Sequence, residues 1–540
     1  MRGGGEPAGA GLHVVAPDLI KLFLLTTMRS TYFALAALLT ASGAHAALNT
    51  TKVAGGELRG VVRNGIASFK GIPFAAPPVG DLRWRAPQPP AAWQGVRTAD
   101  HFEHDCMQRK SGAFGPWSAE FIAKDAMEGG SSEDCLYLNV WTGAARVSEK
   151  RPVFVWIYGG GFNSGGASVP VYDGEGLASK GLVVVVINYR VGIFGFMAHP
   201  ELTKESSHNA SGNYGLLDMV AALQWVKANI GAFGGDASNV TIAGQSAGAF
   251  AVNYLVASPL TKGLFSRAIA ESGGVFNSNQ TLQQGEANGV AFQRKLGAAN
   301  LKEMRAKSAD VIQNGGGRGG PIVDGYVISK SVAEIFAAGQ QNDVPSILGW
   351  NADDGTNFNP PPTPEAFRAN ATRLYGDRAE EFLKVFPSAT QAETTESQRE
   401  LSRIPTFAWQ SHAWAEAQSK TGASKVYLYF FNRVAPGTPE QTKYGAHHTG
   451  EVPYALNTLA RWDRPFEPAD RKLADEMSSY WVNFAKTGNP NSAGLPAWPA
   501  YSSSNPQSME MSTDPHAIPT PDQARFAFFD AFYASRRAQR

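Results

Sequence analysis

Apolar positions along this chain gather in short runs bounded by glycine, asparagine or charged residues. Strands that are apolar on both faces are typical of a parallel sheet covered by helices on each side. Helix-like segments such as Leu216–Ile230 separate the runs. The pattern therefore predicts an α/β fold with a large, mostly parallel sheet flanked by helices. The expected strands are Val153–Tyr158, Leu182–Asn188, Val240–Ala243, Ala268–Ala270, Ser346–Gly349 and Val426–Phe431.

Two further patterns modify this sheet. Asn64-Gly65 separates two short β-like runs, which is the signal for a hairpin with a primed turn. A hairpin at the front of the chain gives the sheet an antiparallel edge, so we expect a mixed sheet. The stretches 276–340 and 356–420 are rich in helical and loop patterns. We expect them to form a cap over the C-terminal edge of the sheet.

The N-terminal region has the layout of a signal peptide. Met28-Arg29 precedes an apolar run, Tyr32 to Leu39, and Ala44-His45-Ala46 gives an A-x-A cleavage pattern. The apolar run is too short to span a bilayer. We expect export to the periplasm or the medium, with residues 1–27 as an N-terminal extension, residues 28–46 as the signal peptide and residues 47–540 as a single domain.

Composition narrows the choice of partners. The chain has 540 residues, 43% of them hydrophobic, and a formal net charge of +1. This composition supports a large core and gives no reason to expect a nucleic acid as partner, or a membrane span in the mature chain. Cys106 and Cys135 are expected to form one disulfide in an oxidising compartment, with two free buried thiols as the alternative. Two cysteines are too few for a metal site built on soft ligands.

The stretch Ser238–Phe250 carries the strongest candidate chemistry. An apolar, β-branched run meets Gly244-Gln245-Ser246-Ala247-Gly248, and a small-residue helical pattern follows. This is the layout of a nucleophile elbow, in which a serine lies on a tight turn between a strand and a helix. Glycine is needed on both sides because side chains there would collide with neighbouring backbone. A simple Gly/Ser turn is the alternative interpretation.

A second glycine-rich segment, Tyr158–Phe162, directly follows the predicted strand that begins at Val153. A hydrolase of this layout places its oxyanion loop there, because residues without side chains let amide groups approach the developing negative charge. The amide of Ala247 would supply a further donor. Each such donor typically lowers the barrier by ~3 kcal/mol. A merely flexible turn is the alternative.

A serine nucleophile also needs a base and a group that orients the base. In hydrolases of this layout the acid and then the histidine follow the serine along the chain. The loop after the last predicted strand offers His447 and His448, and an earlier strand end offers Asp353 and Asp354. Spacing alone does not choose within either pair, and an exposed loop histidine or a turn-capping aspartate is the alternative.

Together these segments resemble the type-B carboxylesterase family, the group that contains para-nitrobenzyl esterases, fungal lipases and cholinesterases on the α/β-hydrolase fold. The resemblance runs from about Val53 to Phe532, and its motifs are highly specific as a set. They are G-I-P-F-A at 71–75, L-R-W at 82–84, E-D-C-L-Y-L-N at 133–139, G-G-G-F at 159–162, G-N-Y-G-L-L-D at 212–218, F-G-G-D at 233–236, the elbow, P-I-V-D-G at 321–325 and N-F-A-K-T-G-N-P-N at 483–491.

The resemblance implies a role for each candidate side chain. The family's acid falls on Asp354 and its base on His448, with Ser246 as the nucleophile. The implied reaction is ester hydrolysis through an acyl-enzyme, which requires neither a metal nor a cofactor. The oxyanion donors that the resemblance implies are Gly160, Gly161 and Ala247.

The resemblance also has structural implications. Cys106–Cys135 matches the family's first disulfide, and Arg83 with Glu133 matches a structural ion pair. The expected partner is a small-molecule ester, and the protein is expected to be a monomer or a homodimer.

Three departures from the family pattern concern the substrate. Asp354 stands where glutamate is commoner, which shortens the acid by one methylene. Gln245 replaces the glutamate that most relatives carry beside the serine, which removes a negative charge from the site. Gly315–Gly319, just before P-I-V-D-G, lines the acyl pocket in the family, and here Arg318 lies among glycines.

Loss of an anion and gain of a cation favour an acyl group with free carboxylates. We therefore expect an ester with a bulky, polycarboxylate acyl group, and Gln245, Arg318 and His447 are the candidate substrate-binding residues. The alternative is that Arg318 points into solvent. Competing functions are a general carboxylesterase for small neutral esters, a non-catalytic binding protein on the esterase fold, and an acyltransferase or amidase with the same triad.

Overall fold

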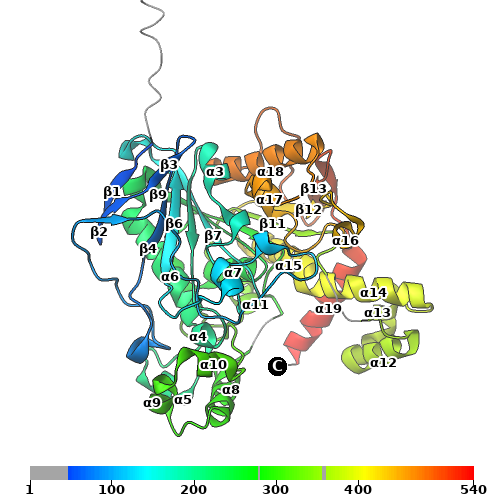
Figure 1. The fold of residues 1–540 in the computed structure, drawn as a ribbon. Coiled ribbons are helices and arrows are strands. Elements are labelled where there is room, and N and C mark those ends of the chain that lie inside the picture. The colour runs from blue at the N-terminus through cyan, green and yellow to red at the C-terminus, as the bar shows by residue number, and fades with distance from the viewer. Residues whose placement is uncertain (1–46, 278–279, 356–359, 540) are drawn as a thin grey trace, which may run out of the picture. The chain divides into compact units, whose positions relative to one another are not determined.

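Two sheets occur in the part of the chain that the computed structural model describes, which is residues 47–277, 280–355 and 360–539 (Figure 1). The predicted signal peptide lies outside these residues. The smaller sheet has 3 strands, β1 (Thr50–Val53), β2 (Gly56–Arg59) and β5 (Val96–Thr98). The larger sheet has 11 strands, in the order β14 (His516–Pro519), β13 (Gln507–Met511), β12 (Val426–Phe431), β11 (Ser346–Asn351), β10 (Arg267–Glu271), β9 (Gly235–Gln245), β7 (Arg151–Ile157), β8 (Val183–Ile187), β6 (Tyr137–Thr142), β4 (Ile66–Pro73) and β3 (Val61–Arg63).

The large sheet is parallel at its centre and antiparallel at both edges. Every neighbouring pair from β8 through β7, β9, β10, β11 and β12 to β13 is parallel. The edge pairs β6–β8, β4–β6, β3–β4 and β13–β14 are antiparallel. The six apolar runs coincide with β7 to β12, which are buried along most of their length. The predicted mixed, mostly parallel sheet is confirmed.

The predicted hairpin is also present. Strands β3 and β4 pair in antiparallel register, with Arg63 opposite Ile66. Asn64 has φ 50° and Gly65 has φ 77°, so both turn residues adopt the left-handed conformation that a type I′ turn requires.

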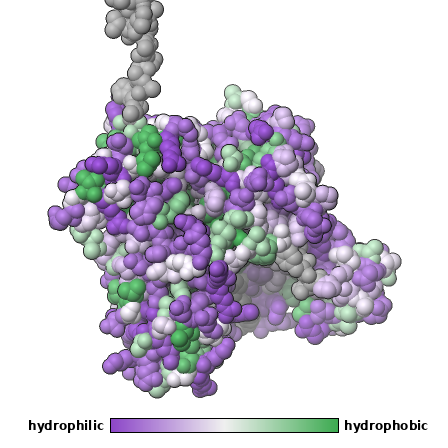
Figure 2. All heavy atoms as spheres, viewed as in Figure 1, coloured by the Kyte–Doolittle hydropathy of each residue, from purple (hydrophilic) through white to green (hydrophobic). Residues whose placement is uncertain are grey.

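Helices cover the faces of the large sheet and form the cap (Figure 1). The stretch 276–340 contains α8 to α11, and 356–420 contains α12 to α15, as the helical pattern predicts. Figure 1 shows α8–α10 and α12–α14 as two groups at the lower end of the view, and Figure 2 shows the surface hollowed between them. The helices are α2 (Lys124–Glu128), α3 (Glu175–Ser179), α4 (Gly192–Phe196), α5 (Pro200–Glu205), α6 (Tyr214–Asn229), α7 (Ala247–Ala257), α8 (Leu282–Lys295), α9 (Leu301–Ala306), α10 (Ala309–Asn314), α11 (Val332–Ala337), α12 (Pro364–Tyr375), α13 (Ala379–Val385), α14 (Gln391–Arg403), α15 (Trp409–Thr421), α16 (Pro439–Thr442), α17 (Val452–Ala455), α18 (Pro468–Thr487) and α19 (Gln523–Ala538).

Several strands do not coincide with any of the six apolar runs. The series of runs ends at β12, whereas the sheet continues into β13 and β14. Strand β13 has the sequence QSMEM, in which polar and apolar residues alternate, because the strand lies near the sheet edge and is buried only in part. The small sheet consists of short strands with many polar residues, such as TTKV and GELR.

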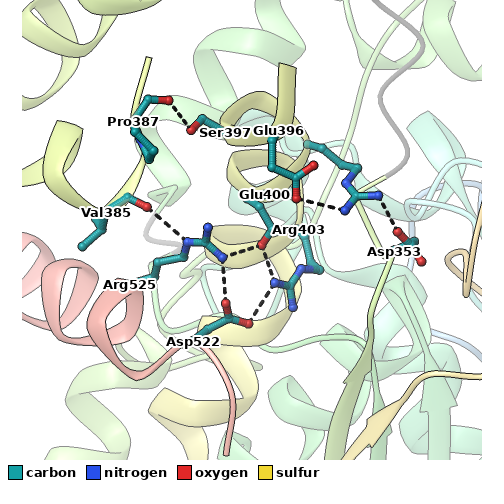
Figure 3. A network of polar contacts seen from close by, with 10 residues as sticks. Asp353, Val385, Pro387, Glu396, Ser397, Glu400, Arg403, Asp522 and Arg525 are labelled. Atoms are coloured by element: carbon teal, nitrogen blue, oxygen red, sulfur yellow. Dashed lines mark hydrogen bonds and ion pairs between the residues drawn. The ribbon is translucent and has the colours of Figure 1, made fainter. Parts of the chain in front are cut away.

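A buried ionic network fixes the last helix against the cap (Figure 3). Arg403 of α14 pairs with Glu400 and lies 2.8 Å from Asp522, which precedes α19. Arg525 of α19 lies 2.8 Å from both Glu400 and Asp522. Two arginines and two carboxylates thus neutralise one another, which offsets the cost of burying Glu400 and Arg403 beside the half-buried Arg525. The network joins α14 to the C-terminal helix.

None of the helices in the described ranges combines the length and the apolar character that a bilayer-spanning segment needs.

Candidate active site

Ser246 lies at the junction of β9 and α7, where its backbone has φ 57° and ψ −124°. A non-glycine residue with positive φ is strained, so the surrounding chain must hold this turn in place. The Ser246 amide donates to the carbonyl oxygen of Glu271 on β10 at 2.9 Å, and the Ser246 carbonyl accepts from the Phe250 amide in α7 at 2.9 Å. The turn is therefore anchored to the sheet on one side and to the helix on the other.

Two glycines make this turn sterically possible. A Cβ atom at Gly244 would lie 2.6 Å from the backbone of Gly248. A Cβ atom at Gly248 would overlap the carbonyl oxygen of Ile157, the last residue of β7. The structure therefore has the strand–turn–helix layout that the motif predicts, and the two glycines are required by the close approach of β7, β9 and α7.

Asp354 and His448 are brought together from two loops. Asp354 follows β11, and its Oδ1 lies 2.8 Å from Nδ1 of His448. Its other oxygen, Oδ2, accepts from the hydroxyl of Ser272 at 2.8 Å and from the amide of Asn351 at 2.7 Å. Asp354 is almost completely buried. These contacts fix the carboxylate, and Nε2 is the ring nitrogen of His448 that does not bind the aspartate.

The neighbouring aspartate has a different role. Asp353 accepts from the Ala446 amide at 2.8 Å and from Arg399 of α14 at 2.9 Å, and Figure 3 shows it facing that helix. It therefore stabilises the loop that carries His448, and neither of these two bonds involves the imidazole. Of the two candidates that spacing leaves open, Asp354 is the one that contacts the histidine.

Ser246 and His448 line one pocket of about 340 Å³. The pocket is lined on one side by Gly159, Gly160 and Gly161, and much of the rest of its wall is aromatic. The Trp117 ring lies edge-on to the His448 ring, with 6.5 Å between the centroids. We call this cavity the aromatic pocket, after the aromatic residues that line it: Phe114, Trp117, Phe121 and Tyr172.

The glycine loop beside the serine has a backbone that only glycine adopts readily. Gly160 has φ 106° and Gly161 has φ 62°. A Cβ atom at Gly160 would overlap the carbonyl oxygen of Ser164, which accounts for the glycine there. The Gly160 carbonyl accepts from the amides of Asn163 and Ser164 at 3.0 and 3.1 Å, and these bonds hold the loop in shape.

Gln245 is fully buried beneath the histidine and also lines the pocket. Its Nε2 atom lies 3.4 Å from Nδ1 and 3.3 Å from Nε2 of His448. Nearly equal distances to both ring nitrogens place the amide group against the ring rather than in line with one nitrogen. Gln245 thus supports the imidazole without adding a charge.

The other two candidate substrate-binding residues lie elsewhere. His447 is buried against Trp462, its Nδ1 donates to the His448 carbonyl at 2.8 Å, and it is not among the residues that line the aromatic pocket. Burial lowers the pKa of His447 to about 4, so the ring is neutral. Arg318 is exposed and lines a second pocket that adjoins the first.

Two buried glutamates lie behind the site. Burial raises the pKa of Glu271 to about 8, and Trp481 donates to this carboxyl group at 2.8 Å. Burial, followed by the charges of Asp354 and Glu271, raises the pKa of Glu451 well above its ordinary value. Asn351 donates its side-chain amide to Glu451 and its backbone amide to Asp354. Protonated carboxyl groups here limit the negative charge around Asp354.

Sequence reasoning missed Ser272 and Trp117. Ser272 follows β10 in the sequence E-S-G-G and has φ 57°, so a small-residue turn at the end of a parallel strand was a usable signal. Trp117 lies in the irregular segment between the two cysteines, where no hydrophobic period indicates which face a side chain occupies. Its contact with His448 depends on the tertiary structure.

Two structural features implied by the family resemblance are present. Cys106 and Cys135 form a disulfide. Arg83 donates from Nε to Glu133 at 2.6 Å and pairs with it through a second nitrogen, and both side chains are largely buried. The disulfide closes a loop of the chain that contributes Trp117 to the aromatic pocket.

A strained serine between a strand and a helix, on a mixed and mostly parallel sheet, defines the class of α/β-hydrolases. Within that class, the model of the carboxylesterase family matches residues 45–529, and the chain belongs to this family.

Known relatives are consistent with this assignment. The chain is 38% identical over 463 residues to fumonisin B1 esterase from Sphingopyxis macrogoltabida, with 82% of each chain covered. It is 34% identical to para-nitrobenzyl esterase from Bacillus subtilis, with 83% of this chain and 91% of the relative covered. A solved PNB esterase structure matches with a TM-score of 0.78 at 30% identity, covering 90% of this chain and 99% of the other.

The elbow geometry leads to a stability prediction. Gly248→Ala forces a Cβ atom onto the Ile157 carbonyl, so β7 and α7 must separate. We expect the free energy of unfolding to fall by about 2–3 kcal/mol, as in overpacked cores. Gly231→Ala is the matched control, because a Cβ atom there has no heavy atom within 4 Å. Denaturant unfolding of both variants is the measurement, and equal stabilities would contradict the steric account.

The raised pKa of Glu271 leads to a prediction about pH. Between pH 4.5 and about 8 the folded protein holds a proton on Glu271 that the unfolded chain has released. Stability therefore falls as the pH rises through this window. Glu271→Gln does not titrate and keeps an acceptor for Trp481, so its stability relative to the wild type should increase from pH 5 to pH 8. Thermal unfolding at several pH values measures this, with the exposed Glu396→Gln as control. A difference that does not change with pH would show that Glu271 is ionised in the folded state.

Proposed function

We propose that Ser246, His448 and Asp354 are the catalytic triad of this carboxylic ester hydrolase. The contact between Asp354 and His448 carries the proposal, because it fixes the imidazole in the pocket that the strained Ser246 also lines. The amides of Gly160, Gly161 and Ala247 are the proposed oxyanion donors. The two glycines line the same pocket as the serine, and Ala247 begins the helix that follows it.

In the proposed mechanism Ser246 Oγ attacks the ester carbonyl while His448 accepts the hydroxyl proton. Asp354 keeps the proton of the neutral ring on Nδ1 and stabilises the imidazolium that forms. His448 then protonates the leaving alcohol, and the acyl-enzyme remains. Water repeats the sequence on the acyl-enzyme, releases the acid and restores the serine. Ser272 and the Asn351 amide hold Asp354 in place throughout.

We further propose that the acyl group is a bulky polycarboxylate, such as tricarballylate in fumonisin-type esters. Three observations support this. Gln245 places a neutral amide where a carboxylate would repel an anion. Arg318 lines a pocket next to the one that contains Ser246. The relative with 38% identity is named a fumonisin B1 esterase. A general esterase for small neutral esters is the competing proposal.

Export of the protein is also proposed, with residues 47–540 as the mature single domain. The disulfide Cys106–Cys135 supports export, because such bonds persist in oxidising compartments.

The triad assignment predicts the effects of two matched substitutions. Asp354→Asn should lower kcat by about 10³–10⁴-fold, because the amide favours the wrong imidazole tautomer. Asp353→Asn should change kcat less than about tenfold, since Asp353 bonds the Ala446 amide and Arg399 instead. A fluorophosphonate should label the wild type at Ser246 and should not label Ser246→Ala. Equal losses in the two aspartate variants, or labelling at another serine, would refute the assignment.

The substrate proposal predicts discrimination by charge. A monoester of tricarballylate should have a kcat/KM at least about tenfold above that of its fully methylated analogue, because the charge-assisted contacts to free carboxylates are lost on methylation. Steady-state kinetics with the same alcohol in both substrates isolates the acyl group. Equal kcat/KM values would exclude the polycarboxylate preference but would not affect the assignment of the protein as an ester hydrolase.

A further inference from the structure

A second pocket, of about 630 Å³, adjoins the aromatic pocket. The two share Ser111 and Ser164, and Ser164 donates to the Gly160 carbonyl in the oxyanion loop at 3.3 Å. The second pocket therefore begins where the proposed reacting carbonyl binds. It is lined by the start of α4, the ends of α8 and α10 and the glycine segment that follows, and these helices lie side by side in Figure 1.

Four cationic side chains line this pocket, which we call the cationic pocket: Arg109, Lys110, Lys295 and Arg318. They come from three segments far apart in sequence. No acidic residue is among the lining residues. All four residues are exposed, and within residues 47–277, 280–355 and 360–539 no carboxylate lies within 4 Å of any of the four cationic groups.

The glycine segment allows two of these cations to approach each other. A Cβ atom at Gly316 would lie 3.1 Å from Nζ of Lys295 and 3.5 Å from Nη2 of Arg109. Gly316 also has φ 70°, which disfavours a side chain. The ammonium and the guanidinium thus converge over one bare stretch of backbone. Solvent screens the repulsion between these two exposed positive charges, and an anion bound between them would be attracted by both.

We propose that the cationic pocket binds the free carboxylates of the acyl group, with Lys295, Arg109 and Arg318 as the principal contacts. This inference rests on the proposed function, since it names the subsite for the acyl group of the same reaction. The oxyanion loop divides the ester, so that the polycarboxylate lies in the cationic pocket and an apolar alcohol lies in the aromatic pocket. Arginine binds carboxylates in a bidentate manner, and lysine contributes a point charge.

Hydrolysis changes the charge in this pocket. Deacylation by water forms a new carboxylic acid from the former ester carbonyl, and the acid loses its proton at neutral pH. The released polyacid therefore has one more negative charge than the acyl group had. The cationic pocket should hold this product, and the free polyacid should be a competitive inhibitor.

Calorimetric binding of free tricarballylate to the full-length Ser246→Ala protein tests the proposal without catalysis. We expect binding that weakens at least tenfold in Arg109→Gln/Lys295→Gln and weakens steeply with added salt. Arg294→Gln/Lys302→Gln is the matched control, because it removes the same charge from exposed positions on α8 and α9 that do not line the pocket. Butyrate and inorganic phosphate are the comparison ligands, and both should bind more weakly than tricarballylate.

The same two double variants, made with Ser246 intact, separate this inference from the proposed function. Loss of the charge discrimination in Arg109→Gln/Lys295→Gln, together with its retention in Arg294→Gln/Lys302→Gln, supports the inference. If Arg109→Gln/Lys295→Gln still discriminates between charged and methylated esters and binds tricarballylate unchanged, the cationic pocket is not the subsite. The proposed preference for polycarboxylate esters would then still hold. Tighter binding of phosphate than of tricarballylate would also overturn it. Equal hydrolysis of charged and methylated esters by the wild type would instead overturn the proposed substrate.

Discussion

The close approach of β7, β9 and α7 is the constraint on which the site depends. Ser246 has a left-handed backbone that an isolated turn would not keep, and the bonds to Glu271 and Phe250 hold it. Gly244 and Gly248 allow the three elements to meet because any side chain there would collide with backbone. Strain at one residue is thus maintained by a well-packed sheet, so the position of the hydroxyl is determined by the whole fold.

Some charged groups of the molecule are paired with opposite charges, whereas others have no such partner. In the network of α14 and α19, each arginine faces a carboxylate, and the charges cancel. Behind the site, burial keeps Glu271 protonated near neutral pH, which limits the negative charge around Asp354. The cationic pocket has no such compensation among the described residues. Its cations are exposed, and under the proposal made above an external anion provides the compensating charge.

Local patterns were sufficient for much of the fold. Continuous apolar runs predicted β7 to β12, because a strand buried on both faces consists mainly of apolar residues. Asn64-Gly65 predicted the hairpin, because a primed turn favours these two residue types. The edge strands β13 and β14 were missed, since their partial burial gives a polar composition. For the site, spacing located two pairs of candidates, and only the family motifs and then the three-dimensional contacts separated Asp354 from Asp353. The clustering of Arg109 with Lys295 has no sequence signal at all, because the two residues lie on segments joined only by tertiary packing.

The disulfide loop between Cys106 and Cys135 contributes to both pockets: Trp117 belongs to one wall and Arg109 to the other. A covalently closed insert of this kind can diverge without disturbing the sheet that holds the nucleophile. One covalently closed loop therefore contributes side chains to both pockets. Substitutions within it can alter both cavities while the strands around Ser246 stay unchanged.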